Sequence, residues 1–231
     1  MSPKLNKSKA EAEAEAELGS AEPEDYVSNF GTYDDEVIQK VLTALLPVSS
    51  LLGQDEVRRD GQRVASVLIP LVQRGDEWQV ILTQRPDTMP SHPGQIAFPG
   101  GKREFGESTL NAALRETQEE IGIDRQFVTI IGRLPSFNLM SGYRVTPFVG
   151  LVDPKADITP DPREVADVFE VPFSFLMDGA NHKTREVHFN DKDHTMIDMP
   201  YTGDDGVYRY IWGMTAMTLY RLYQRGFEDK N

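Results

Sequence analysis

Five glutamates fall within residues 101–123, GKREFGESTLNAALRETQEEIGI. Three of them, Glu116, Glu119 and Glu120, stand at i, i+3 and i+4, positions that are neighbours on a helix. Like charges at these offsets repel by about 0.2–0.5 kcal/mol per pair. Mg2+ and Mn2+ prefer carboxylate oxygens and would remove that repulsion, so the spacing favours a metal site. The alternative is a solvated helix face whose charges form salt bridges.

The same stretch predicts a helix that carries these carboxylates. Residues 108–120 contain no Gly or Pro, and Leu, Ala, Arg, Gln and Glu dominate. We expect Ser108 to be the N-cap and Gly122 to end the helix. Glu107 is expected to pair with Arg115, eight residues on, and so to pin the preceding loop onto the helix. The predicted buried stripe is Leu110, Ala113, Leu114 and Thr117.

Glycines bracket the acidic helix and strengthen the metal-site interpretation, because FPGG at 98–101 leads in and Gly122 leads out. The spacing resembles the Nudix box of the Nudix hydrolases: Gly101, five residues, Glu107, seven residues, Arg115-Glu116-Thr117, one residue, Glu119-Glu120, one residue, Gly122-Ile123. One position departs, since Thr117 stands where the family usually has an aliphatic residue. We expect a packing adjustment there and no loss of chemistry.

A second signature lies directly upstream, at residues 83–101, TQRPDTMPSHPGQIAFPGG. It resembles the pattern of Nudix enzymes that cleave coenzyme A, at Leu82-Thr83, Arg85, Gly94 and Phe98-Pro99-Gly100-Gly101. The resemblance implies that Arg85, Gly94 and Phe98 contact the substrate. Further segments at 141–147, 164–172 and 211–216 resemble the same subfamily, so the likeness covers about residues 34–225. The first of them supplies Arg144 as another substrate-binding candidate.

Two positions depart from the upstream signature. Pro86 replaces a small Ser or Ala, and Pro90 stands where a second Arg is expected. A proline has neither the charge nor the side-chain donors with which an arginine binds a phosphate. Pro90 therefore favours an alternative substrate, another nucleoside diphosphate derivative such as ADP-ribose or a dinucleotide.

Several of these candidates also have ordinary structural explanations. Arg85 is alternatively a surface cation or a strand-end salt bridge, and Arg144 is alternatively a salt bridge across strands. Phe98 is predicted to lie in the core, with lining of the pocket as its other role. Trp212 is predicted to lie in the core.

The resemblance implies metal-dependent attack of water on a phosphoanhydride. It implies the metal ligands Glu116, Glu119 and Glu120, helped by the carbonyl of Gly100 or Gly101, with Mg2+ or Mn2+ as cofactor. One carboxylate must act as the general base, and the candidates are Glu120 and Glu164. With coenzyme A or an acyl-CoA, the products would be 3′,5′-ADP and 4′-phosphopantetheine or its acyl form. A catalytically silent Nudix-fold binding protein is the alternative from another class.

Composition limits the other possibilities. The 231 residues include no cysteine and four histidines, none in an HxH or HxxxH pattern, so a metal site must be mainly carboxylate. The net charge of −13 argues against a protein that coats nucleic acid. No apolar run is long enough to cross a bilayer, and no secretory signal is visible, so we expect a cytoplasmic protein without a membrane partner.

The apolar patterns predict an α/β fold. Residues 1–24 are expected to be a disordered acidic tail, and 34–227 the Nudix domain. Predicted helices cover 34–46, 108–120 and 213–227, with a polar linker at 48–63. Predicted strands cover 64–73, 78–83, 96–98, 127–134, 143–152 (interrupted by Pro147), 165–171, 183–189, 196–201 and 208–212. The resemblance implies a mixed β-sheet sandwiched between helices, and the sequence leaves a homodimer open.

Overall fold

The computed structural model describes residues 35–48, 63–89, 91–139, 141–189 and 191–228. The predicted acidic tail, most of the predicted linker and Pro90 lie outside these ranges. None of the helices in the described ranges combines the length and the apolarity that crossing a membrane requires.

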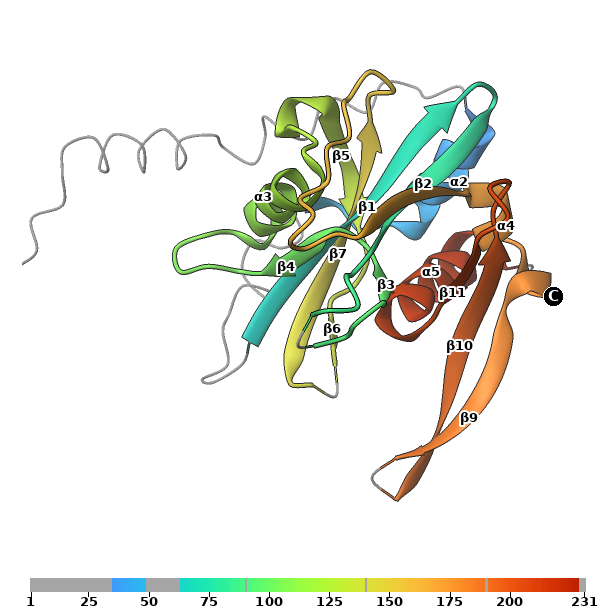
Figure 1. The fold of residues 1–231 in the computed structure, drawn as a ribbon. Coiled ribbons are helices and arrows are strands. Elements are labelled where there is room, and N and C mark those ends of the chain that lie inside the picture. Colours follow the sequence, from blue (N-terminus) through green and yellow to red (C-terminus); the bar gives the residue numbers. More distant parts are fainter. Residues whose placement is uncertain (1–34, 49–62, 90, 140, 190, 229–231) are drawn as a thin grey trace, which may run out of the picture.

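A mixed sheet of eight strands forms the centre of the described chain (Figure 1). Its path is β3-β2-β1-β7-β5; in addition, β4 pairs with β1, β6 with β7 and β8 with β2. The bounds are β1 Arg63–Arg74, β2 Glu77–Gln84, β3 Ile96–Ala97, β4 Gly100–Lys102, β5 Val128–Arg133, β6 Phe137–Asn138, β7 Tyr143–Val152 and β8 Asp167–Pro172. β1 and β7 run parallel in the middle, while the other pairs are antiparallel. The predicted hairpin of β1 and β2 is confirmed.

Helices cover both faces of this sheet (Figure 1). α3 (Thr109–Ile121) packs on one face, and α2 (Glu36–Ala44) and α5 (Gly213–Gly226) on the other. Alternate residues of the central strands feed the two cores: Leu68, Ile81 and Phe148 toward α3, and Val67, Leu82 and Val149 toward α2 and α5. The predicted α/β fold, a mixed sheet between helices, is confirmed.

A smaller sheet of β9 (Lys183–Phe189), β10 (Lys192–Thr202) and β11 (Tyr208–Ile211) packs beside α5. Its β9–β10 hairpin projects away from the main sheet (Figure 1). Short elements complete the described chain: α4 Phe173–Leu176 and the 3-10 turns η3 Arg125–Phe127 and η4 Gly179–Asn181. The predicted strand at 196–201 begins too late, because Lys192 already pairs with Phe189 and β10 starts there.

Two further expectations from the sequence are corrected. β7 runs without a break through Pro147, whose carbonyl accepts a hydrogen bond from Leu134 N at 2.9 Å. The nitrogen of Pro147 points to the same side as its carbonyl, toward the segment that connects β5 to β6. The absence of an N–H there removes no hydrogen bond between β7 and β1. Trp212 is not core: it continues the outward alternation of β11 and is 38 % exposed.

Candidate active site

The site is built where β4 meets α3. Ser108 caps the helix by accepting from Asn111 N at 3.1 Å, and Gly122 ends it in the left-handed conformation, with φ 74°. The predicted helix and both of its ends are confirmed. All four residues of the predicted stripe are buried, and Thr117 returns its hydroxyl to the carbonyl of Ala113 at 2.7 Å. Thr117 in place of an aliphatic residue therefore leaves no unsatisfied hydroxyl in the helix.

Gly100 and Gly101 let the acidic helix approach the sheet closely. Gly100 has φ +149°, and a Cβ there would stand 2.4 Å from the carbonyl oxygen of Ser66. A Cβ on Gly101 would stand 2.4–2.5 Å from the carboxylate atoms of Glu116. The Gly100 N–H donates to Glu120 Oε2 at 3.2 Å. Both carboxylates thus lie directly against the glycine backbone.

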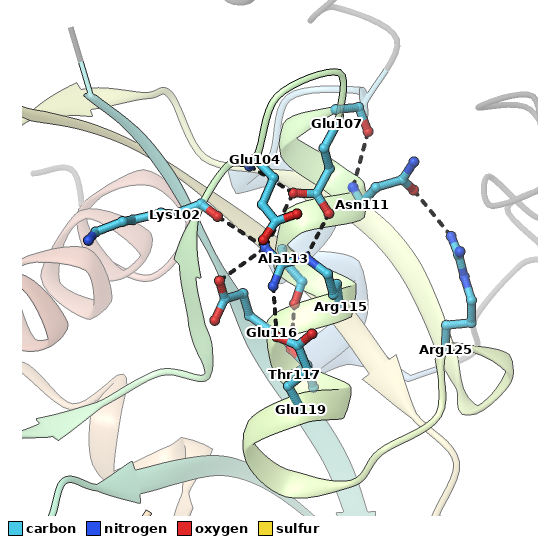
Figure 2. Close-up of polar contacts among 11 residues, drawn as sticks. Lys102, Glu104, Glu107, Asn111, Ala113, Arg115, Glu116, Thr117, Glu119 and Arg125 are labelled. Carbon is cyan, nitrogen blue, oxygen red and sulfur yellow. Dashed lines mark hydrogen bonds and ion pairs between the residues drawn. The ribbon is translucent and has the colours of Figure 1, made fainter. Parts of the chain in front are cut away.

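Arg115 organises the acidic side chains around it (Figure 2). Its Nε donates to Glu107 Oε1 at 2.9 Å, which confirms the predicted pair. Its Nη2 lies 3.0 Å from Glu116 Oε1, and its Nη1 lies 2.7 Å from Glu119 Oε2. Arg115 Nη2 also donates to the Lys102 carbonyl at 3.1 Å, which ties the helix to β4.

Glu120 is the most buried carboxylate of the site, with 6 % of the residue exposed. Burial raises its pKa to about 8; the Gly100 N–H opposes that shift, and the negative charges of Glu116 and Glu164 add to it. Burial also raises the pKa of Glu116, against the opposing charge of Arg115 and with the support of Glu119 and Glu164. The structure therefore brings Glu164 into the field of the helix carboxylates, although it stands forty-four residues from Glu120.

Arg85 reaches the same site from the end of β2. Its charge lowers the pKa of Glu120, whereas its own Nε is buried and finds no hydrogen-bond partner in the described part of the chain. Its backbone N–H donates to Gln95 O at 3.0 Å, which closes the loop that contains Gly94. Gly94 has φ +65°, and a Cβ there would stand 2.8 Å from Asp87 Oδ1. The conformation of this loop therefore depends on that glycine.

The two remaining substrate candidates lie differently. Arg144 stands half-buried in β7 opposite Val64 and Asn138. Val64 lies two residues along β1 from Ser66, the partner of Gly101. Phe98 belongs to the core on the α5 side, with 2 % exposed, and offers almost no surface to a ligand. The predicted core position of Phe98 is confirmed, and its contact with substrate stays a prediction.

The donor set suits a hard cation. Burial and their mutual repulsion disfavour the charged forms of Glu116 and Glu120, against the opposing charges of Arg115 on Glu116 and Arg85 on Glu120. A divalent ion would stabilise both carboxylates in their charged forms. In the described part of the chain, no three His, Asp or Glu side chains converge into a ready-made metal group. Arg115 holds Glu116 and Glu119 instead, so a cation must compete with that arginine for them.

Comparison with known proteins identifies the family. Residues 62–190 match the model of the NUDIX domain. The chain belongs to the Nudix hydrolase family. Two relatives, each named Uncharacterized Nudix hydrolase NudL, come from Yersinia pestis (strain Pestoides F) and Yersinia pseudotuberculosis serotype O:1b (strain IP 31758). Each is 33 % identical over 196 residues, which span 84 % of this chain and 96 % of the relative.

Solved structures show similarity to this Nudix hydrolase at lower identity. A Caenorhabditis elegans Ap4A hydrolase in a binary complex is 20 % identical, with a TM-score of 0.42 over 48 % of this chain and 80 % of that one. The NUDIX domain of Shewanella oneidensis NrtR, complexed with ADP ribose, is 17 % identical, with a TM-score of 0.41 over 57 % and 87 %. Membership in the family makes the chain a hydrolase of a nucleoside diphosphate derivative, and Nudix hydrolases generally use Mg2+ or Mn2+.

The two adjacent glycines should respond differently to alanine. Gly100→Ala puts a methyl group against the Ser66 carbonyl, which is backbone, so we expect a loss of about 3 kcal/mol or more in the free energy of unfolding. Gly101→Ala meets only the movable end of Glu116, so stability should change by about 1 kcal/mol or less while metal-dependent turnover collapses. Urea unfolding and a turnover assay of both variants test this. Equal stability loss in the two variants would contradict the packing argument.

Glu120 should also set a pH dependence of the metal-free protein. Its pKa is about 8 in the folded protein, above the ordinary value of 4.5. The contribution of Glu120 to the free energy of unfolding is therefore fully present below pH 4.5 and is lost as the pH rises through 8. Glu120→Gln replaces the carboxylate with a neutral side chain of nearly the same size, so no charge is buried at this position at high pH. We expect the variant to exceed the wild type in unfolding free energy by about 1–3 kcal/mol at pH 8.5 and to match it near pH 4.5. Chelator-treated samples in urea provide the measurement, and a variant less stable at pH 8.5 would refute the expectation.

Proposed function

We propose that this Nudix hydrolase cleaves the diphosphate of coenzyme A or an acyl-CoA to 3′,5′-ADP and 4′-phosphopantetheine or its acyl form. The observation that carries the proposal is the position of Arg85. It belongs to the upstream segment that resembles the coenzyme A signature, it acts electrostatically on Glu120, and its buried Nε has no hydrogen-bond partner among the residues that the structure describes. A phosphate oxygen would satisfy that donor next to the carboxylates.

The metal ligands in this proposal are the Glu116, Glu119 and Glu120 carboxylates and the Gly101 carbonyl. Mg2+ or Mn2+ bound there would neutralise phosphate charge and lower the pKa of a bound water. The chain itself positions the reactants, which is most of what phosphoryl-type chemistry requires. Arg115 fixes Glu107 to the helix, and the Gly100 N–H fixes Glu120 to β4.

The general base is one of two carboxylates. Glu120 is buried and held by the Gly100 N–H, which suits a group that stays in place as a ligand. Glu164 is exposed at the rim, in the loop before β8, and acts electrostatically on both Glu116 and Glu120. Both remain candidates. A loss of kcat with unchanged Mn2+ affinity in Glu164→Gln would select Glu164.

The alternative substrate is another nucleoside diphosphate derivative, such as ADP-ribose or a dinucleotide. Pro90 carries this alternative, because it replaces the second arginine of the coenzyme A signature. Arg144 offers a second cation on the same sheet, in β7. The alternative therefore differs from the main proposal in the group attached to the diphosphate and shares its carboxylate chemistry.

Product analysis tests the proposal directly. Purified protein is incubated with Mg2+ or Mn2+ and, separately, with coenzyme A, an acyl-CoA, ADP-ribose and a nucleoside triphosphate, and products are identified by mass spectrometry. We expect 3′,5′-ADP and phosphopantetheine to form fastest, and Glu119→Gln, whose side chain is 56 % exposed, to fold normally and lose turnover. Faster release of AMP from ADP-ribose would favour the alternative.

Arg85 should act on the substrate and not on stability. In Arg85→Gln the charged donor next to Glu120 is lost, so we expect KM for coenzyme A to rise about tenfold or more, with an unchanged melting temperature. Arg74→Gln is the matched control, because Arg74 pairs with Glu170 on the surface far along β1 from this site. Arg85→Gln with an unchanged KM and a lowered melting temperature would show that Arg85 is a structural cation.

A further inference from the structure

Ser66 is a fully buried serine in β1 whose hydroxyl has no hydrogen-bond partner within the described ranges of the chain. Its neighbours along the strand, Val67, Leu68 and Ile69, are apolar core residues. A buried hydroxyl without a partner costs stability, and an alanine of nearly the same size would avoid that cost. The serine therefore requires an explanation beyond packing.

The sheet register places this hydroxyl at the catalytic helix. Ser66 pairs directly with Gly101 of β4, and residues opposite each other in antiparallel strands present their side chains on the same face. On that face, the position of a Gly101 Cβ is 2.4–2.5 Å from the Glu116 carboxylate. Opposed Cβ positions lie about 5 Å apart, so the Ser66 hydroxyl stands within reach of a hydrogen bond to Glu116 after a small side-chain movement.

Other groups near Ser66 are already engaged. Thr146, its neighbour on β7, shares a hydrogen bond of 2.8 Å with Ser136. Glu116 Oε1 accepts from Arg115 at 3.0 Å. Glu116, the carboxylate that lies at Gly101 on the Ser66 face, is thus held by Arg115.

We propose that Ser66 is a positioning residue that donates its Oγ–H to the Glu116 carboxylate when Glu116 turns from Arg115 toward a divalent cation. The arginine and the serine then hold two positions of one carboxylate. Arg115 keeps it off the site in the cation-free protein, and Ser66 supports it as a ligand. The inference rests on the metal-site part of the proposed function and is independent of which diphosphate is cleaved.

Ser66→Ala in the full chain tests the inference with two readouts that should move in opposite directions. The melting temperature of the chelator-treated protein should stay equal or rise, because an unpaired buried hydroxyl is removed. The Mn2+ dissociation constant, measured by titration calorimetry without substrate, should rise about tenfold, as expected for a lost hydrogen bond to a charged group. With substrate, kcat at subsaturating Mn2+ should fall and recover at saturating Mn2+.

Thr109→Val is the matched control. Thr109 is also buried with an unpartnered hydroxyl, but it lies in the first turn of α3, seven residues before Glu116. We expect its melting temperature to behave like that of Ser66→Ala and its Mn2+ affinity to equal the wild type. An unchanged Mn2+ affinity in Ser66→Ala, or an equal loss in both variants, would overturn the inference. Cleavage of ADP-ribose in place of coenzyme A would overturn the substrate assignment and leave this one standing.

Discussion

The structure depends on keeping buried carboxylates close to one another and to the backbone of two glycines. The Glu116 carboxylate lies where a side chain at position 101 would have to be, and Glu120 accepts a hydrogen bond from the Gly100 N–H. Such burial disfavours the charged forms, and the raised pKa values of both groups express that cost. The cost is tolerated because α3 is fixed at both ends by its own caps and packs on the sheet along a fully buried stripe.

Two arginines supply positive charge near the described carboxylates, and they differ in how many hydrogen bonds they make. Arg115 binds three glutamates and the Lys102 carbonyl, so it is a structural cation of the metal-free state. Arg85 has a buried donor without a partner and faces the same carboxylates. Arg85 supplies positive charge near these carboxylates, and a divalent ion bound there would add more, so a net charge of −13 does not prevent binding of a phosphorylated substrate.

The C-terminal sheet also bears on the site through a buried arginine. Arg209, 5 % exposed, pairs with Asp205 at 2.7 Å and with Asp167 at 3.1 Å, and its guanidinium lies 4.2 Å from the centre of the Phe169 ring. These contacts fix β11 against the start of β8, three residues after Glu164. The smaller sheet thus helps to set the position of a residue that acts on both buried glutamates.

The sequence by itself determined what is local in the chain. Composition and spacing were sufficient for the acidic helix, its caps and its cluster of carboxylates, since i, i+3 and i+4 geometry needs no distant partner. The Glu107–Arg115 pair, eight residues apart, and the α/β fold also followed from the sequence pattern. The two-residue strand β6, and the path of β7 through Pro147, depend on neighbours far along the chain. Only the tertiary structure brought Arg85 and Glu164 within electrostatic range of Glu120, exposed Trp212, and paired Ser66 with Gly101. Strand register decides which residues from distant segments share a face, and register is a property of the assembled sheet.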